Sequence, residues 1–96
     1  MRINELCRES HRIAVEKGFW DRPLEFGTRI ALIHREVSEA LEEHRCGNEE
    51  KVGEEMADAV IRIADLCYAE GIDLEDEIAR KTAYNKTRSR LHGKNY

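Results

Sequence analysis

Two acidic motifs hold the residues of this sequence that are best suited to chemistry. They are Glu36-x-x-Glu39 and Glu55-x-x-Asp58, each a pair of carboxylates three residues apart. On an α-helix such a pair lies on one face, about 60° apart and about one turn of rise from each other. Carboxylates from two adjacent helices can therefore converge, and all-oxygen ligands favour the hard ions Mg²⁺ and Mn²⁺. Zinc would require His or Cys, and a di-iron bundle would require Glu-x-x-His, which no histidine of the chain completes.

The apolar residues around the motifs indicate which way the carboxylates face. Leu32 lies one helical turn before Glu36, and Ile61 and Leu66 border the acidic strip of the second motif. Both strips are therefore expected to face the interior of a helical bundle. Close, buried carboxylates repel one another and lose hydration, a cost that a divalent cation would offset. The alternative is that these acids are the solvated edges of two charged helices.

A basic stripe follows near the C-terminus. Lys81, Asn85 and Arg88 are spaced i, i+4 and i+7, so they share one side of a helix, and His92 joins them if the helix continues. Cations and an amide donor suit the oxygens of phosphate groups. The alternative is an exposed helix end whose basic side chains interact favourably with the helix dipole. His92 and Lys94 also lie in a tail that would either fold over a bound ligand or be disordered without one.

Trp20 and His11 are the candidates for contacting a nucleobase. Phe19 and Trp20 follow the first helical segment, and aromatic faces stack on bases of any identity. The alternative is that both aromatic residues pack at the end of the bundle or in a dimer interface. His11 would line the base side of the site, or else it is a polar residue on a helix surface.

Helical periodicity over most of the chain predicts an all-α fold. Helices are expected at about residues 3–17, 28–45, 50–69 and 73–88. Gly18, Gly47 and Gly71 should end the first three helices. Thr28 and Asp73 are the expected N-caps of the second and fourth. The second and third helices, joined by a short turn, should form an antiparallel hairpin at the centre of a four- to five-helix bundle.

Length and composition narrow the class of protein. Residues 1–96 are expected to form one domain, with 88–96 as a tail that is either closed over a ligand or mobile. The net charge of −4 gives no general reason to bind a nucleic-acid polymer or an anionic membrane. A signal peptide and an apolar run of about 18 residues are both missing, which predicts no export and no membrane span.

The cysteines and the apolar surface lead to two further expectations. Cys7, Cys46 and Cys67 form no Cys-x-x-Cys pair, and an odd number is a poor basis for disulfides, so a reduced, cytoplasmic setting is expected. Short helices with one largely apolar member leave more hydrophobic surface than a chain of 96 residues easily covers. A homodimer is therefore the minimum expectation, and each active site would then be able to take its basic stripe from another subunit.

The motifs together resemble a known family. In chain order they are Glu36-x-x-Glu39, Glu55-x-x-Asp58, Lys81-x-x-x-Asn85-x-x-Arg88 and His92-Gly93-Lys94. This combination resembles the MazG-like all-α nucleoside triphosphate pyrophosphohydrolases over nearly the whole chain. One difference concerns the first motif, where many members have two adjacent glutamates and this chain has Arg35 before Glu36. Glu54 or Asp65 would replace the missing acid only if the geometry allows it.

The resemblance implies a reaction and a ligand set. Glu36, Glu39, Glu55 and Asp58 would bind Mg²⁺, or Mn²⁺, and a (d)NTP would be hydrolysed to (d)NMP and pyrophosphate in nucleotide-pool clean-up or salvage. Glu39 or Glu36 would activate the attacking water. The family resemblance also allows a homotetramer built from dimers.

Two other functions remain open from the residues. A phosphoribosyl-ATP pyrophosphatase would share the helical scaffold and the acidic metal site but act on a different substrate. A non-enzymatic helical interaction module would use the acidic pairs to meet a basic partner and would not depend on a divalent metal.

Overall fold

The computed structural model describes residues 2–90 and contains only helices in that part of the chain. The helices are α1 (Ile3–Glu16), α2 (Phe26–Arg45), α3 (Glu49–Ala69) and α4 (Leu74–Lys86). The predicted all-α class is therefore confirmed for the described residues. None of these helices is long and apolar enough to cross a membrane.

The predicted helix ends agree well with the structure. Gly18, Gly47 and Gly71 follow α1, α2 and α3 with φ angles of 87°, 80° and 71°. These angles lie in the left-handed region, which glycine enters without the steric penalty of a Cβ atom. Asp73 caps α4 as expected, because its Oδ1 accepts a hydrogen bond from the Asp76 N–H at 3.0 Å.

Two boundaries differ from the prediction. Helix α2 begins at Phe26, and its N-cap is Glu25 in an extended conformation without a side-chain capping bond. Thr28 lies inside the first turn, so the entry of the extended chain after Pro23 sets the start of α2 and a capping hydroxyl does not. Helix α4 ends at Lys86, where the Thr87 hydroxyl donates to the Tyr84 carbonyl at 2.7 Å. Side-chain bonds of this kind compete with continuation of the helix.

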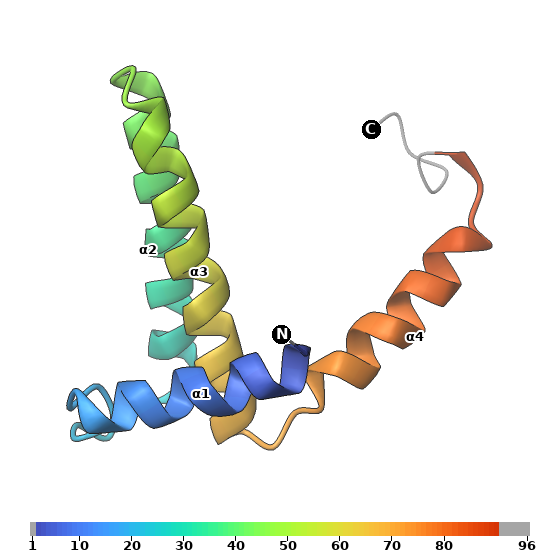
Figure 1. Cartoon of the computed structure of the whole chain (residues 1–96), viewed down its shortest axis with the longest axis horizontal. Coiled ribbons are helices and arrows are strands. Elements are labelled where there is room, and N and C mark those ends of the chain that lie inside the picture. Colours follow the sequence, from blue (N-terminus) through green and yellow to red (C-terminus); the bar gives the residue numbers. More distant parts are fainter. Residues whose placement is uncertain (1, 91–96) are drawn as a thin grey trace.

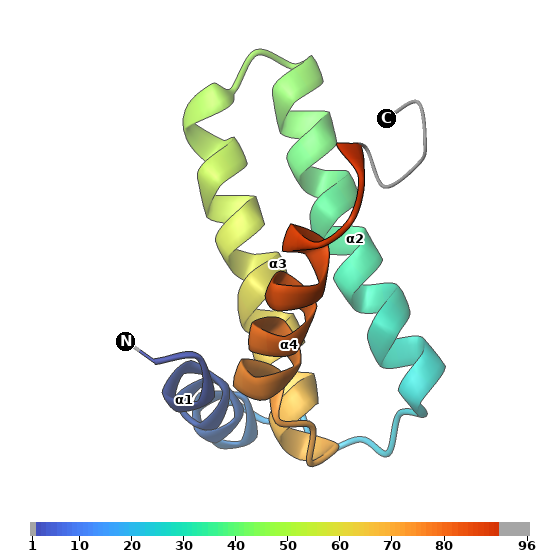
Figure 2. The ribbon, with the colours of Figure 1, turned by 90° about the vertical axis from the view of Figure 1, so that its right-hand side faces the viewer.

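Three helices pack together, and their core is made mostly of small residues. Helices α2 and α3 run antiparallel on either side of the turn at Gly47, and α1 packs across α3 at the end remote from that turn (Figure 1; Figure 2). The buried apolar residues are Cys7, Ala14, Ala40, Ala59, Ala64 and Leu66. Alanines at these contacts let the helix backbones approach closely.

Helix α4 does not join this packing, in contrast to the expected four-helix bundle. It contacts α1 near its own start and then points away from the α2–α3 hairpin (Figure 1). Asn4 holds this junction: its Nδ2 donates to Asp73 Oδ1 at 2.9 Å, and its Oδ1 accepts from the Glu75 N–H at 3.2 Å. No residue of α4 is buried.

A large amount of apolar surface is exposed as a result. Val60 is 51% exposed and Tyr84 55% exposed, and neither lies at a chain end. Other large exposed apolar residues of α2, α3 and α4 are Phe26, Val37, Leu41, Met56, Ile61, Ile63, Tyr68 and Ile78. Single exposed apolar residues are ordinary, but this number on a small chain is typical of a surface that an interaction covers.

Candidate metal centre between α2 and α3

Three of the predicted carboxylates converge. Glu36 and Glu39 on α2 and Glu55 on α3 each offer an oxygen, and these oxygens lie within 4.8 Å of one another. The antiparallel hairpin causes this, because the pairs lie on either side of the turn at Gly47 and meet about halfway along the two helices. Asp58 lies close by and lines the same groove as Glu36. We call Glu36, Glu39, Glu55 and Asp58 the acid cluster.

The members of the acid cluster differ in burial. Glu36 is only 6% exposed, Glu55 is half-buried, and Glu39 and Asp58 are exposed. The expectation that both strips face inward therefore holds for Glu36 and in part for Glu55, and it is wrong for Glu39 and Asp58. Small residues such as Ala40 and Ala59 fill the contact between α2 and α3. The side chains of Glu39 and Asp58 lie at its edge, where a ligand has access.

Electrostatics links the carboxylates to one another. The pKa of Glu55 lies above its ordinary value because desolvation disfavours its charged form, and because the Glu39 carboxyl and the charges of Asp58 and Glu36 act in the same direction. Desolvation and the neighbouring carboxyls thus both disfavour the charged form of Glu55. The donor set consists of carboxylate oxygens alone, so it fits a hard divalent cation such as Mg²⁺ or Mn²⁺ and does not fit zinc.

A basic residue that the sequence reasoning missed lies against the acid cluster. Arg62 Nε donates to Glu36 Oε1 at 2.7 Å, with 32% of the Arg62 side chain exposed. Arg62 follows Asp58 by four residues, so it occupies the same face of α3 one turn on. The i, i+4 spacing of Asp58 and Arg62 is the feature of the sequence that places Arg62 beside the second acidic motif. Arg35, by contrast, lies 3.7 Å from Glu39 through its Nε, too far for a hydrogen bond, and both side chains are about half exposed.

The acid cluster opens into a groove between α1 and α3. Its volume is about 480 Å³, and Glu36, Asp58 and Arg62 are among its polar lining residues. The remaining lining residues, mostly apolar, are Leu6, Glu9, Ser10, Ile13, Ala14, Phe19, Ile61 and Asp65. A lining that combines apolar side chains with a few polar groups is the general form of a small-molecule site.

Trp20 and His11 lie together beside Asp65, which is one of the residues that line this groove. Their ring centroids are 5.2 Å apart in an edge-to-face arrangement. Asp65 Oδ1 accepts from Trp20 Nε1 at 2.9 Å and lies 2.8 Å from His11 Nδ1. Asp65 is therefore engaged by these rings and does not replace the acid missing at Arg35. Arg29 covers one face of the indole, with its Cζ 3.6 Å from the ring centroid.

Glu54 does not replace the acid missing at Arg35 either, because it is exposed and its oxygens are not part of the converging set.

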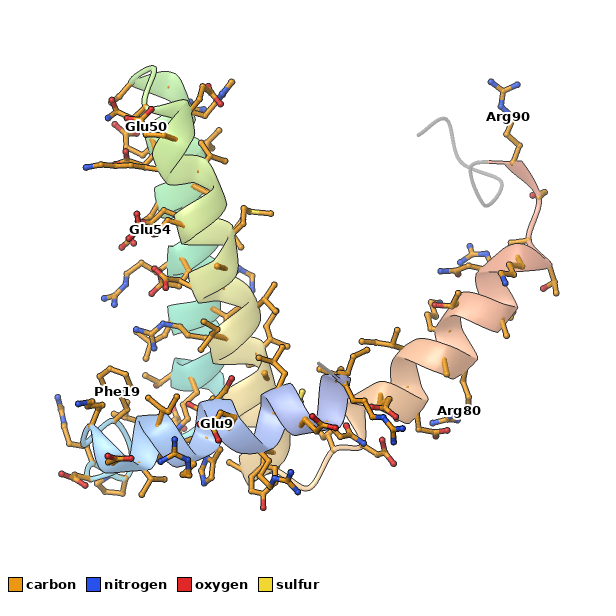
Figure 3. All side chains as sticks on the ribbon, in the orientation of Figure 1. Glu9, Phe19, Glu50, Glu54, Arg80 and Arg90 are labelled. Carbon is orange, nitrogen blue, oxygen red and sulfur yellow. The ribbon has the colours of Figure 1, made fainter. Side chains whose placement is uncertain are left out.

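Figure 3 shows Phe19 at the end of α1 remote from α4, on the opposite side of the molecule from Arg80. Phe19 is 59% exposed, so within this chain it is not a core residue.

The basic stripe lies apart from the acid cluster within the chain. Lys81 and Asn85 are on α4, and Arg88 lies beyond the end of that helix. Lys81 Nζ and Arg88 Cζ are 5.0 and 5.4 Å from the ring centroid of Tyr84, so both cations gather on one exposed aromatic ring. His92 and Lys94 lie outside the described residues.

No protein-family model matches this sequence, and no curated protein or solved structure matches it. The functional assignment therefore depends on the residues and their geometry, and the resemblance to MazG-like enzymes stays a prediction.

Proposed function

We propose that this chain is a Mg²⁺-dependent nucleoside triphosphate pyrophosphohydrolase, which converts a (d)NTP and water to (d)NMP and pyrophosphate. The observation that supports this most directly is the convergence of oxygens from Glu36, Glu39 and Glu55 within 4.8 Å. The raised pKa of Glu55, caused by desolvation and then by its acidic neighbours, is the state expected of a cation site.

The acid cluster would hold the metal through Glu36, Glu39, Glu55 and Asp58. Mg²⁺, or Mn²⁺ in its place, supplies charge neutralisation for the triphosphate oxygens and a fixed point for an in-line attack. Glu39 is the exposed member on α2 and is suited to accept the proton of the attacking water, with Glu36 as the alternative base. The groove next to the acid cluster has room for the nucleoside, and Asp65, which lines it, contacts the His11 and Trp20 rings that would meet the base.

The proposal includes a homodimer or homotetramer in which the basic stripe acts on a neighbouring subunit. Helix α4 leaves the α2–α3 hairpin, and its exposed Ile78 and Tyr84 would be covered by a second copy. Lys81, Asn85 and Arg88 would then bind phosphate oxygens at the partner's acid cluster. Symmetric association of this type buries apolar surface on both copies at once. The proposed setting is the cytoplasm, where free thiols such as Cys46 stay reduced.

The test is a substrate panel with and without divalent metal. Canonical and modified nucleoside triphosphates and phosphoribosyl-ATP are each incubated with the full chain, Mg²⁺ or EDTA, and pyrophosphate and monophosphate are measured. The proposal expects Mg²⁺-dependent release of both products from at least one nucleoside triphosphate. Turnover of phosphoribosyl-ATP alone would replace the substrate assignment. The absence of both turnover and Mg²⁺ binding would favour the non-enzymatic module.

A further inference from the structure

Arg62 is the one cation within hydrogen-bond distance of the acid cluster among residues 2–90. It uses Nε, the nitrogen within the side chain, to reach Glu36 Oε1 at 2.7 Å. The contact joins α3 to α2 across 26 residues of sequence. Arg62 therefore connects the acid cluster to the groove, whose lining it shares with Glu36 and Asp58.

Glu36 depends on this contact because it is the most buried carboxylate of the acid cluster. Only 8% of its side chain is exposed, and a buried carboxylate without a partner is strongly unfavourable. The Nε bond engages Oε1, and the second carboxylate oxygen of Glu36 has no hydrogen bond within residues 2–90. A carboxylate held by one oxygen in this way has a defined orientation, which is what outer hydrogen bonds provide for metal ligands in general.

We propose that Arg62 is a positioning residue that holds Glu36 in the orientation required for divalent metal binding. This inference rests on the proposed metal site but adds a role that neither acidic motif contains. Arg62 contributes in two opposing ways. Its hydrogen bond to Glu36 favours metal binding by fixing the ligand in advance, and its positive charge disfavours binding by repulsion. The inference is that the hydrogen bond is the larger effect.

Isosteric variants separate the two contributions. In Arg62→Gln the amide Nε2 stands the same number of bonds from the backbone as the arginine Nε, so a donor is kept and the charge is lost. In Arg62→Met the side chain ends at the position of the arginine Nε, as in Gln, and both donor and charge are lost. Arg35→Gln is the matched control for charge alone, because Arg35 lies beside the same acid cluster without a hydrogen bond to Glu39.

The experiment measures Mn²⁺ affinity by titration calorimetry without nucleotide, for the full chain and each variant, with helicity checked by circular dichroism. Arg62→Met should weaken Mn²⁺ binding roughly 10- to 100-fold, as for loss of other outer-shell partners. Arg62→Gln should keep the affinity within severalfold of the original, and so should Arg35→Gln. In a Glu36→Gln background Arg62→Met should have little further effect, because the carboxylate that it positions is gone.

The outcomes distinguish this inference from the proposed function. Equal or tighter Mn²⁺ binding by Arg62→Met would overturn the positioning role and identify Arg62 as a competitor of the metal, while the metal site would stand. Weak binding by both Arg62 variants would also overturn it, because a donor kept at the Nε position would then fail to preserve the affinity. If the unsubstituted chain binds no Mn²⁺, the proposed metal function fails, and this inference fails with it. If Arg62→Met loses its helicity, the Mn²⁺ affinities of Arg62→Gln and Arg35→Gln are compared instead. Much weaker binding by Arg62→Gln than by Arg35→Gln would overturn the positioning role.

Discussion

The acid cluster and the basic stripe have very different support in this molecule. The acid cluster lies on two helices that pack along their length, and one of its members is buried and bonded across the hairpin by Arg62. The basic stripe lies on and just beyond α4, which is attached to the packed helices mainly through α1 and buries no residue. A single chain therefore assembles the proposed metal site without help, but the proposed phosphate contacts require a second copy.

The largest expected effect comes from changing the acid cluster itself. Glu39→Gln should reduce Mg²⁺-dependent pyrophosphate release by at least about 100-fold, because the amide neither binds the metal as a charged ligand nor accepts a proton from water. Since Glu39 is exposed, the thermal unfolding midpoint should hardly change. The measurements are product release and circular dichroism melting. Near-normal turnover by this variant would refute the assigned role.

The second prediction tests whether the basic stripe acts on another subunit. Lys81→Ala and Glu39→Gln should each be inactive alone, but mixed and reassociated subunits should regain about a quarter of the original activity, because half of the dimers then contain one intact site. A mixture of Glu39→Gln with Asp58→Asn is the control, since both changes affect the same acid cluster and no intact site can form. Activity of Lys81→Ala alone at the original level would remove the stripe from the mechanism.

The third prediction compares packing in the two regions. Ala64 on α3 is 1% exposed, and Ala64→Leu should destabilise the chain by about 1–3 kcal/mol through overpacking. Ala83→Leu on exposed α4 should stay within about 0.5 kcal/mol at low protein concentration. Denaturant unfolding of both variants provides the comparison. A large loss for Ala83→Leu that depends on protein concentration would show that α4 is buried in an assembly.

The smallest expected effect is a pH dependence of opposite sign in the two regions. The pKa of Glu55 is raised above 4.5 by desolvation and its acidic neighbours, so its contribution to stability is present at low pH and is lost as pH rises through the folded-state pKa. The pKa of Asp73 is lowered from 3.8 by the hydrogen bonds from Asn4 and the Asp76 N–H, so its contribution is lost as pH falls.

Substitution separates these two contributions. Glu55→Gln should flatten the decline in melting temperature above about pH 4.5, and Mg²⁺ should do the same in the unsubstituted chain by compensating the charges. Asn4→Ala should reduce the loss of stability at acidic pH, because Asp73 would then lack its strongest stabilising bond. A melting profile in EDTA that Glu55→Gln leaves unchanged would contradict the electrostatic description of the acid cluster.

Sequence and structure agree where the interactions are local. The glycine stops and the Asp73 cap involve residues only a few positions apart, and the helix-face geometry of Glu36-x-x-Glu39 follows from the helix period alone. Helix α2 begins two residues before Thr28, because the extended chain at Glu25 leads into the helix without a capping side chain.

Longer-range features were beyond sequence reasoning. Arg62 meets Glu36 across 26 residues of sequence. Asp65 meets Trp20 across 45 residues and His11 across 54. These contacts depend on how the helices pack. The exposure of Glu39 and the departure of α4 likewise depend on which helices pack and how closely. Periodicity identifies an amphipathic face, but it does not determine which other face covers it.

The sequence by itself thus determined the helical class, most helix ends and the pairing of carboxylates on each helix, because these follow from backbone hydrogen bonding and side-chain spacing within a few turns. Only the tertiary structure decided that Glu36 is the buried carboxylate, that Arg62 is its partner and that α4 stands apart from the acid cluster. The physical reason is that burial and ion pairing between helices arise from close packing of the whole chain. Small buried residues such as Ala40, Ala59 and Ala64 contribute to that packing as much as the charged residues that they bring together.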